Sequence, residues 1–213
     1  MIYDKVFKRI MDFLLSLIAL PFILVVIFFA GIAIVIDDGF PIFYNAPRIG
    51  KNRKVFKMYK LRSMKNHAPD LRMPDGSTYN APDDPRLTRV GKLLRKTSVD
   101  ELPQVLNVLL GQMSFIGPRP DLPDEATLYE PHEWRRLDVR PGITGYSQAY
   151  FRNSIQTKEK YKNDIYYVDH VSFGLDVKIF FQTVLSVLKS EGVYAQEAAV
   201  DTEDLIDRTE AVT

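Results

Sequence analysis

Two adjacent carboxylates, Asp100 and Glu101, are the residues of this sequence best suited to chemistry. Phosphoryl transfer needs a nucleophile, a divalent cation and donors around the developing charge. A carboxylate can act as the nucleophile and form an acyl phosphate, and a neighbouring carboxylate can hold Mg²⁺, which prefers hard oxygen ligands. Asp-Glu pairs are common, however, and acids also favour the positively polarised start of a helix. Taken alone, the pair fits a capped helix start better than a reaction centre.

Basic residues around the carboxylates favour the chemical interpretation. Arg95 stands five positions before Asp100, and Arg119 follows at the centre of a Pro-Arg-Pro turn. The flanking residues Pro118 and Pro120 restrict the backbone and fix the direction of the guanidinium. A planar guanidinium is a natural bidentate partner for phosphate, and helix N-terminal amides also bind phosphate. The segment therefore contains a nucleophile, a metal ligand and phosphate donors.

Two consecutive helices are predicted to hold these residues. Apolar residues recur at helical spacing from Leu87 to Leu94, with basic residues on the opposite face. A second helix is predicted to start at Ser98, because the tetrapeptide SVDE matches a capping box with Ser98 as N-cap and Glu101 at N3. Gly111 is predicted to end it. This arrangement would place the carboxylate pair in the first turn of a helix.

Three further stretches have recognisable patterns. Residues 41–64 read as short extended pieces around a Gly-Lys-Asn turn, which favours a small β-hairpin. Residues 66–85 hold several prolines and few apolar side chains, so we expect a loop, and we hypothesise that it closes over the site as a lid. Residues 175–189 predict an amphipathic helix, which suits either core packing or a membrane interface.

An uncharged apolar segment extends from Phe13 to Ile36. As a helix it would be roughly 36 Å long, enough for a bilayer core of ~30 Å. Pro21 lies inside it and predicts a kink or break. Basic residues flank it on both sides, at 5–9 and 48–65, and positive charge marks the cytosolic side. A re-entrant hairpin breaking near Pro21 satisfies both flanks, whereas a kinked spanning helix is the commoner element, so the charges alone leave both open.

Composition excludes several classes of function. A net charge of +1 provides no overall field for binding nucleic acid. The absence of cysteine excludes disulfides, thiolate catalysis and cysteine metal sites. The three histidines, His67, His132 and His170, lack the close spacing of a zinc site. Residues 193–213 are rich in acids, and we expect a mobile, solvated tail.

Several long motifs, in the right order, resemble those of the bacterial sugar transferases, which are monotopic polyprenyl-phosphate phosphoglycosyl transferases. The segments are KVFKRIMDF (5–13), FKMYKLRSM (56–64), RLTRVGKLLRKTSVDELPQVLNVLLGQMSFIGPRP (86–120), VRPGITGYSQ (139–148) and DIYYVDHVSFGLDVKI (164–179). The resemblance covers roughly residues 3–190. The chain length resembles that of the small family members, which consist of a catalytic domain and one membrane hairpin.

The resemblance and the patterns together imply a fold and a reaction. The fold class is α+β and mostly helical, with an N-terminal re-entrant membrane helix broken near Pro21, a small β-hairpin and amphipathic interfacial helices around a cytosolic catalytic domain. Residues 1–40 would form the membrane hairpin, 41–192 the catalytic domain and 193–213 the tail. The enzyme would transfer a sugar-1-phosphate from a UDP-sugar to polyprenyl (undecaprenyl) phosphate, releasing UMP and forming a polyprenyl diphosphate sugar.

The resemblance also implies roles for individual residues. Asp100 would attack the sugar-bearing phosphate and carry the phosphosugar, with Mg²⁺ held by Asp100 and Glu101. Arg119 would bind phosphate. The further candidate contacts to phosphate, nucleotide or sugar are Lys60, Arg95, Arg140, Tyr146 and Gln148. Several of these equally suit structural roles. Arg140 could support its own turn, and Tyr146 and Gln148 could be packing side chains.

Three positions depart from the family pattern. Ala46 stands where Gln is usual, Tyr146 where Trp is usual, and His170 where Asn is usual. None of them belongs to the carboxylate pair or to the Pro-Arg-Pro turn, so the implied reaction class stands. The departures leave sugar specificity and donor contacts open.

The implied partners are a UDP-sugar, with an N-acetylated hexose as the expected class, polyprenyl phosphate and membrane lipids. Downstream glycosyltransferases and a second copy of the chain are further candidates. The expected location is the bacterial inner membrane, with the catalytic domain on the cytosolic face. Two other functions stay open, a non-catalytic membrane-anchored partner of glycan enzymes and a hydrolase that cuts the same diphosphate bond. The intact Asp100, Glu101 and Arg119 count against the first, and dependence on polyprenyl phosphate would separate the second.

Overall fold

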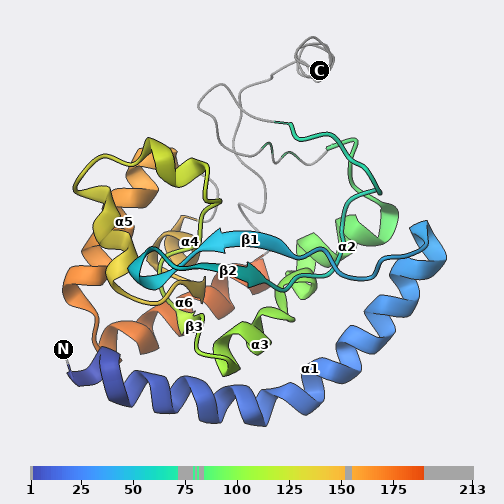
Figure 1. Cartoon of the computed structure of the whole chain (residues 1–213). Helices are drawn as coiled ribbons and strands as arrows, with labels where there is room; N and C mark the ends of the chain where they lie inside the picture. Colours follow the sequence, from blue (N-terminus) through green and yellow to red (C-terminus); the bar gives the residue numbers. More distant parts are fainter. Residues whose placement is uncertain (1, 72–78, 80, 82–83, 152–154, 190–213) are drawn as a thin grey trace.

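The computed structural model describes residues 2–71, 79, 81, 84–151 and 155–189 (Figure 1). The helices are α1 (Lys8–Asp38), α2 (Arg89–Thr97), α3 (Gln104–Leu109), α4 (Tyr146–Tyr150), α5 (Thr157–His170) and α6 (Phe173–Lys189). The strands are β1 (Ala46–Ile49), β2 (Val55–Met58), β3 (Ser114–Ile116) and β4 (Gly142–Thr144). Within the described residues the strands form two small sheets, β1-β2 and β3-β4. This mostly helical architecture confirms the α+β fold class.

The long apolar helix α1 lies along one side of the molecule, and its axis bends (Figure 1). With the π-helical turn Tyr3–Phe7 before it, α1 forms the one segment of the described chain that is long and apolar enough to cross a membrane. Pro21 lies in the interior of α1, where a proline removes a backbone donor and commonly causes a kink. Helix α1 continues through Pro21 without interruption, so the break predicted near Pro21 does not end the helix.

Both ends of α1 are attached to the same body of helices and strands. Near its start, Lys8 Nζ lies 2.5 Å from Asp176 Oδ2 of α6, and both side chains are buried. At its other end, Asp38 Oδ2 lies 3.0 Å from Arg62 Nη1. Asp37 Oδ2 accepts a hydrogen bond from a backbone N–H in the first turn of α2. Because buried charges need partners, these contacts fix both ends of the helix to one body.

The predicted β-hairpin is present between α1 and α2. Strand β1 pairs antiparallel with β2, and the 3-10 turn Lys51–Arg53 connects them. After β2 the chain runs antiparallel to the segment that follows α1, where the N–H of Tyr44 donates to the carbonyl of Lys60. The N–H of Arg62 donates to the carbonyl of Ile42. The hairpin therefore continues as a narrow ladder toward α1.

The predicted helix over residues 87–96 is α2, but the capping box predicted at Ser98 is wrong. Ser98 adopts a left-handed conformation with φ 58° and ends α2, its N–H donating to the carbonyl of Arg95. Because Ser98 closes the preceding helix, its side chain makes no capping bond to the following turn. The carboxylate pair lies in the 3-10 turn Val99–Glu101, and α3 begins only at Gln104. Gly111, with φ 79°, follows α3 as predicted.

Parallel pairing of β3 with β4 fixes the Pro-Arg-Pro turn. The N–H of Gly117 donates to the carbonyl of Thr144, and the N–H of Gly142 donates to the carbonyl of Pro118. The two backbones touch, since a Cβ on Gly142 would lie 2.1 Å from Gly117 N. Only glycine permits so close an approach. The turn that carries Arg119 is thus held against the segment that begins at Arg140.

The C-terminal helices close the other side of the body. A buried cluster joins β3, α4, α5 and α6 around Tyr167 and Ile179. The amphipathic helix predicted at residues 175–189 is present within α6, and one face of it packs in this core. The outer side of α6 exposes Phe180, Phe181, Leu185 and Leu188. Exposed apolar faces of this kind are typical of surfaces that contact a membrane or a partner. Helix α6 therefore packs in the core and presents an apolar face as well.

Two of the sequence predictions fall partly or wholly outside the described residues. The acidic tail at 193–213 lies outside them, and so do residues 72–78, 80 and 82–83 of the loop at 66–85. The lid therefore stays a prediction. Buried Arg86 holds described parts of this loop, because it pairs with Asp84 at 2.8 Å and donates to the carbonyl of Tyr79.

Replacing Gly142 by Ala should lower the free energy of unfolding by about 2 kcal/mol or more, because the new Cβ would overlap the backbone of Gly117. Thermal unfolding in detergent measures the effect. Gly174→Ala is the matched control, since a Cβ there meets nothing within 4 Å and alanine favours a helix by about 1 kcal/mol. Equal melting temperatures for Gly142→Ala and the wild type would contradict the close contact.

Candidate active site

Asp100 is a buried carboxylate in the turn between α2 and α3, with 2% of its side chain exposed. Its backbone carbonyl accepts a hydrogen bond of 2.9 Å from the N–H of Leu61, so the turn is joined to the segment that carries Lys60. Lys60 Nζ lies 3.0 Å from Asp100 Oδ2. Within the described part of the chain, this oxygen has no hydrogen-bond partner. A buried carboxylate oxygen thus faces a cation and retains capacity for another ligand.

Glu101 is held by two cations from different parts of the chain. Arg119 Nη2 donates to Glu101 Oε1 at 2.7 Å, and Lys60 Nζ lies 3.4 Å from the same oxygen. Burial alone would raise the pKa of Glu101, but the positive charges of Arg119 and Lys60 lower it well below its ordinary value. The carboxylate of Glu101 in turn raises the pKa of Arg119. Glu101 and Arg119 are therefore both charged at neutral pH.

Arg119 combines a fixed backbone with an accessible guanidinium. Its side chain is 47% exposed, and its second terminal nitrogen lies 3.4 Å from Glu101 Oε2. This fork-like contact leaves the outer donors of the guanidinium free to meet an anion from solvent. The structure therefore brings together four of the predicted residues, namely Lys60, Asp100, Glu101 and Arg119.

Arg136 is a supporting residue that the sequence did not reveal. Its Nη2 donates to the backbone carbonyl of Arg119 at 3.2 Å and to Asp164 Oδ2 at 2.7 Å. Its Nη1 donates to Asp121 Oδ2 at 2.5 Å, and the side chain is buried. Negative charges outweigh the cost of burial and raise the pKa of Arg136 above its ordinary value. No local pattern in the sequence around Arg136 distinguishes a buried, ion-paired arginine from a solvent-exposed one.

Arg48 is a second basic residue near the site that the sequence analysis did not single out. Burial and the neighbouring charge of Arg119 lower the pKa of Arg48. Among the described residues, its Nη1 is buried and has no hydrogen-bond acceptor. Two guanidinium groups that repel one another favour the binding of an anion between them. The only signal in the sequence was its place at the start of the basic cluster.

Two other predicted phosphate contacts have structural partners. Arg95 Nε donates to Ser63 Oγ at 3.1 Å, on the segment that follows Lys60. Arg140 Nε donates to the carbonyl of Gly111 at the end of α3, at 3.0 Å. Arg9 donates to two further carbonyls at this helix end, and cations are favourable there. Arg140 therefore supports α3, and phosphate binding by Arg95 or Arg140 stays a prediction.

Tyr146 and Gln148 lie on α4. The Tyr146 ring packs on Tyr166, with the ring centroids 5.3 Å apart, and Tyr166 stacks on His170 with 4.2 Å between centroids. Two of the three departures from the family pattern, Tyr146 and His170, thus contact the same aromatic ring. Gln148 Nε2 lies 3.4 Å from the carbonyl of Ile143. These are packing contacts, and a role in the sugar pocket stays a prediction.

The carboxylate pair also fits the requirements of a magnesium ion. Mg²⁺ is usually bound by one or two carboxylates together with substrate phosphates and water, rather than by a closed protein cage. In the described residues, no group of three or more His, Cys, Asp or Glu side chains is placed to hold a metal. Asp100 and Glu101 supply the two carboxylates, and Asp100 Oδ2, which faces Lys60, accepts no hydrogen bond from the described residues. The donor set therefore suits a metal that arrives with a diphosphate.

Comparison with known proteins identifies the family. The profile of the bacterial sugar transferases matches residues 3–190. The chain belongs to this family. It is 43% identical over 188 residues to the uncharacterized sugar transferase EpsL of Bacillus subtilis, covering 88% of this chain and 90% of that protein. The family match, together with the two phosphotransferases described next, confirms the predicted class of enzyme, a phosphoglycosyl transferase.

Two further relatives have names that state a reaction. The transferase is 37% identical over 191 residues to the UDP-N-acetylgalactosamine-undecaprenyl-phosphate N-acetylgalactosaminephosphotransferase of Aeromonas hydrophila, covering 87% of this chain and 44% of that protein. It is 37% identical over 168 residues to the undecaprenyl-phosphate galactose phosphotransferase of Salmonella typhimurium, covering 74% and 35%. The chain thus spans less than half of either phosphotransferase.

Replacing Glu101 by Gln should lower the free energy of unfolding by about 1 kcal/mol at pH 7, a small value because Arg119 is half exposed. The pKa of Glu101 is depressed in the folded state, so its ion pairs stabilise the fold above a pH of about 4. This contribution is lost as the pH falls further. Denaturant titrations of both proteins between pH 7 and pH 3 should show a shrinking difference, and a constant difference would contradict it.

Proposed function

We propose that this transferase moves a sugar-1-phosphate from a UDP-sugar to polyprenyl (undecaprenyl) phosphate, releases UMP and forms a polyprenyl diphosphate sugar. The observation that carries the proposal is the buried Asp100 carboxylate beside Lys60, next to a Glu101 that Arg119 holds. This arrangement supplies a nucleophile and positive charge at one place. The names of the Aeromonas and Salmonella relatives agree with the reaction.

In the first step, a carboxylate oxygen of Asp100 attacks the sugar-bearing phosphorus of the UDP-sugar. A new O–P bond forms, the bridging P–O bond breaks and UMP departs with that electron pair. The product is an aspartyl phosphosugar. Lys60 and Arg119 are placed to neutralise charge on the phosphate oxygens, and Arg48 would contact the same diphosphate.

In the second step, a phosphate oxygen of polyprenyl phosphate attacks the phosphorus that Asp100 carries. The acyl phosphate bond breaks, which restores the Asp100 carboxylate and releases the polyprenyl diphosphate sugar. The burial of Asp100 supports this order of events, because a site that excludes water favours transfer to the lipid over hydrolysis. Mg²⁺ held by Asp100 and Glu101 would polarise the phosphate oxygens when it is bound.

The donor that we propose is a UDP-linked N-acetylated hexose. The Aeromonas relative is named for N-acetylgalactosamine, whereas the Salmonella relative is named for galactose. We place sugar selection near the aromatic group of Tyr146, Tyr166 and His170. Tyr146 and His170 depart from the family pattern, and both pack on Tyr166.

We also propose that α1 is a re-entrant membrane helix and that the catalytic domain lies on the cytosolic face of the inner membrane. Its two ends bind the same body through Lys8 and Asp38, so a crossing of the bilayer would require that body to lie on both sides. Most of its large apolar side chains are exposed between these ends. The apolar face of α6 would lie at the membrane interface.

Replacing Asp100 by Asn should reduce UMP release at least about 1,000-fold, because the amide cannot form the acyl phosphate. UMP is measured with Mg²⁺, undecaprenyl phosphate and a panel of UDP-sugars, with the protein in nanodiscs. Asp169→Asn is the control, since Asp169 is exposed and pairs with Arg135. UMP from the Asp100→Asn protein would contradict the covalent mechanism. If the wild type released UMP at the same rate with and without undecaprenyl phosphate, the protein would be a hydrolase. If no UDP-sugar gave UMP, a non-catalytic anchor would be favoured.

Single cysteines placed before and after α1 in the chain should both react with a membrane-impermeant reagent from the cytosolic side only. The chain has no native cysteine, so Lys5→Cys and Lys54→Cys, both at exposed positions, give clean probes. A membrane-impermeant maleimide is applied to sealed inside-out and right-side-out vesicles. Labelling of both positions in inside-out vesicles alone is expected. Labelling of one position from each side would establish a spanning helix and contradict the re-entrant one.

A further inference from the structure

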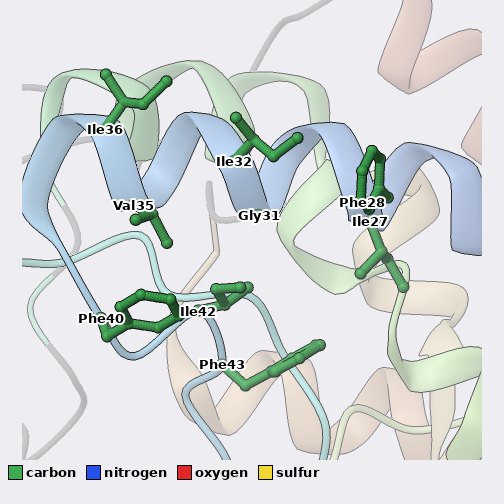
Figure 2. A pocket seen from close by; sticks show the side chains of 9 residues that line it. All are labelled: Ile27, Phe28, Gly31, Ile32, Val35, Ile36, Phe40, Ile42 and Phe43. Carbon is green, nitrogen blue, oxygen red and sulfur yellow. The ribbon is translucent and has the colours of Figure 1, made fainter.

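An apolar groove lies between the C-terminal half of α1 and the segment that follows it (Figure 2). Ile27, Gly31 and Val35 line it from the helix, and Phe40, Ile42 and Phe43 line it from the segment. Figure 2 shows the Val35 side chain directed from α1 toward the segment that carries Phe40 and Ile42. All of the lining residues are apolar. The groove therefore suits a hydrocarbon and offers no partner to a polar ligand.

The groove is one ladder step from the segment that holds the Asp100 turn. Phe43 in its wall forms an antiparallel bridge with Leu61, and neighbouring strands lie about 5 Å apart. Leu61 follows Lys60 in the chain and donates its N–H to the carbonyl of Asp100. A molecule in the groove therefore lies beside the segment whose lysine faces the nucleophile.

One apolar cluster connects the groove to the site. Leu61 is fully buried in a cluster with Ile27, and Ile42 and Val99 pack against the same cluster. Ile27 and Ile42 line the groove, whereas Val99 directly precedes Asp100. Gly31 allows the helix and the segment to approach, since a Cβ there would lie 3.3 Å from the Ile42 side chain. The groove wall and the reaction centre are thus parts of one packed unit.

We infer that this groove binds the first isoprene units of the acceptor lipid and so delivers its phosphate to the Asp100 site. The inference rests on the proposed function and adds the location of the acceptor chain. The occupant must be a hydrocarbon that enters from the bilayer, because the groove is apolar and lies on the membrane helix. We expect the occupant to carry a phosphate as well, because Phe43 in the groove wall pairs with Leu61, which follows Lys60 in the chain and donates to the carbonyl of Asp100.

The test fills the groove with a larger side chain. Val35→Trp places an indole where the chain would lie, and Val25→Trp is the matched control on the same helix, at an exposed position outside the groove. With the donor that supports turnover, Val35→Trp should raise the KM for undecaprenyl phosphate about tenfold over Val25→Trp. The exchange of labelled UMP into the UDP-sugar without lipid reports the first step alone, and it should stay at the control level.

The two half-reactions separate the outcomes. If both variants show the wild-type KM for the lipid while UMP exchange continues, the groove inference fails and the transferase function stands. If the wild type performs neither UMP exchange nor lipid-dependent UMP release, the proposed function fails and the inference fails with it. Loss of exchange in Val35→Trp alone would overturn a role confined to the acceptor.

A photoreactive probe identifies the occupant directly. A polyprenyl phosphate with a diazirine in the isoprene unit next to the phosphate should label peptides within residues 27–43 of the wild type, and undecaprenyl phosphate should displace it. Equal displacement by phosphatidylglycerol would make the groove a site for ordinary bilayer chains and overturn the inference. Displacement only upon dimerisation of the protein would make it a contact between copies, with the same consequence.

Discussion

The balance of charge around two consecutive carboxylates is the constraint on which the site depends. Asp100 and Glu101 lie in one short turn with little access to solvent, and each would be costly to bury without a cation nearby. Their cations come from separate places, Lys60 from the segment that follows β2 and Arg119 from the Pro-Arg-Pro turn. Arg136, which itself needs two carboxylates, holds the backbone of that turn. The fold thus has to bring three distant segments together before the pair can exist.

Attachment of α1 at both ends links this site to the long apolar helix that we propose lies in the membrane. The buried pair of Lys8 with Asp176 and the pair of Asp38 with Arg62 leave the apolar surface of the helix between them open. Arg62 stands two residues from Lys60, so the end of the helix and the site share one strand segment. A soluble donor and a lipid acceptor meet most simply where an apolar helix ends beside a charged centre. The bent shape of α1 in Figure 1 is consistent with that geometry.

The groove follows from the same arrangement. The chain leaves α1 and immediately pairs with the segment from Lys60 to Arg62, so a hydrocarbon surface and a charged surface are separated by a single strand. Leu61 lies between the two surfaces and contacts both. Its buried side chain packs in the apolar cluster with Ile27, and its N–H donates to the carbonyl of Asp100. A lipid phosphate has just this division into an apolar chain and an anionic head, which gives the two surfaces a common ligand.

The sequence by itself determined the long apolar helix, the hairpin, α2, α6, the carboxylate pair and the Pro-Arg-Pro turn, because each depends on local periodicity or on the backbone limits of proline and glycine. It failed at Ser98, where a local capping pattern lost to the end of the preceding helix. Only the tertiary structure decided that Arg140 supports α3, that buried Arg136 holds Arg119, and that a nitrogen of Arg48 has no acceptor among the described residues. The role of an arginine depends on which carbonyls and carboxylates surround it, and those neighbours are distant in the chain.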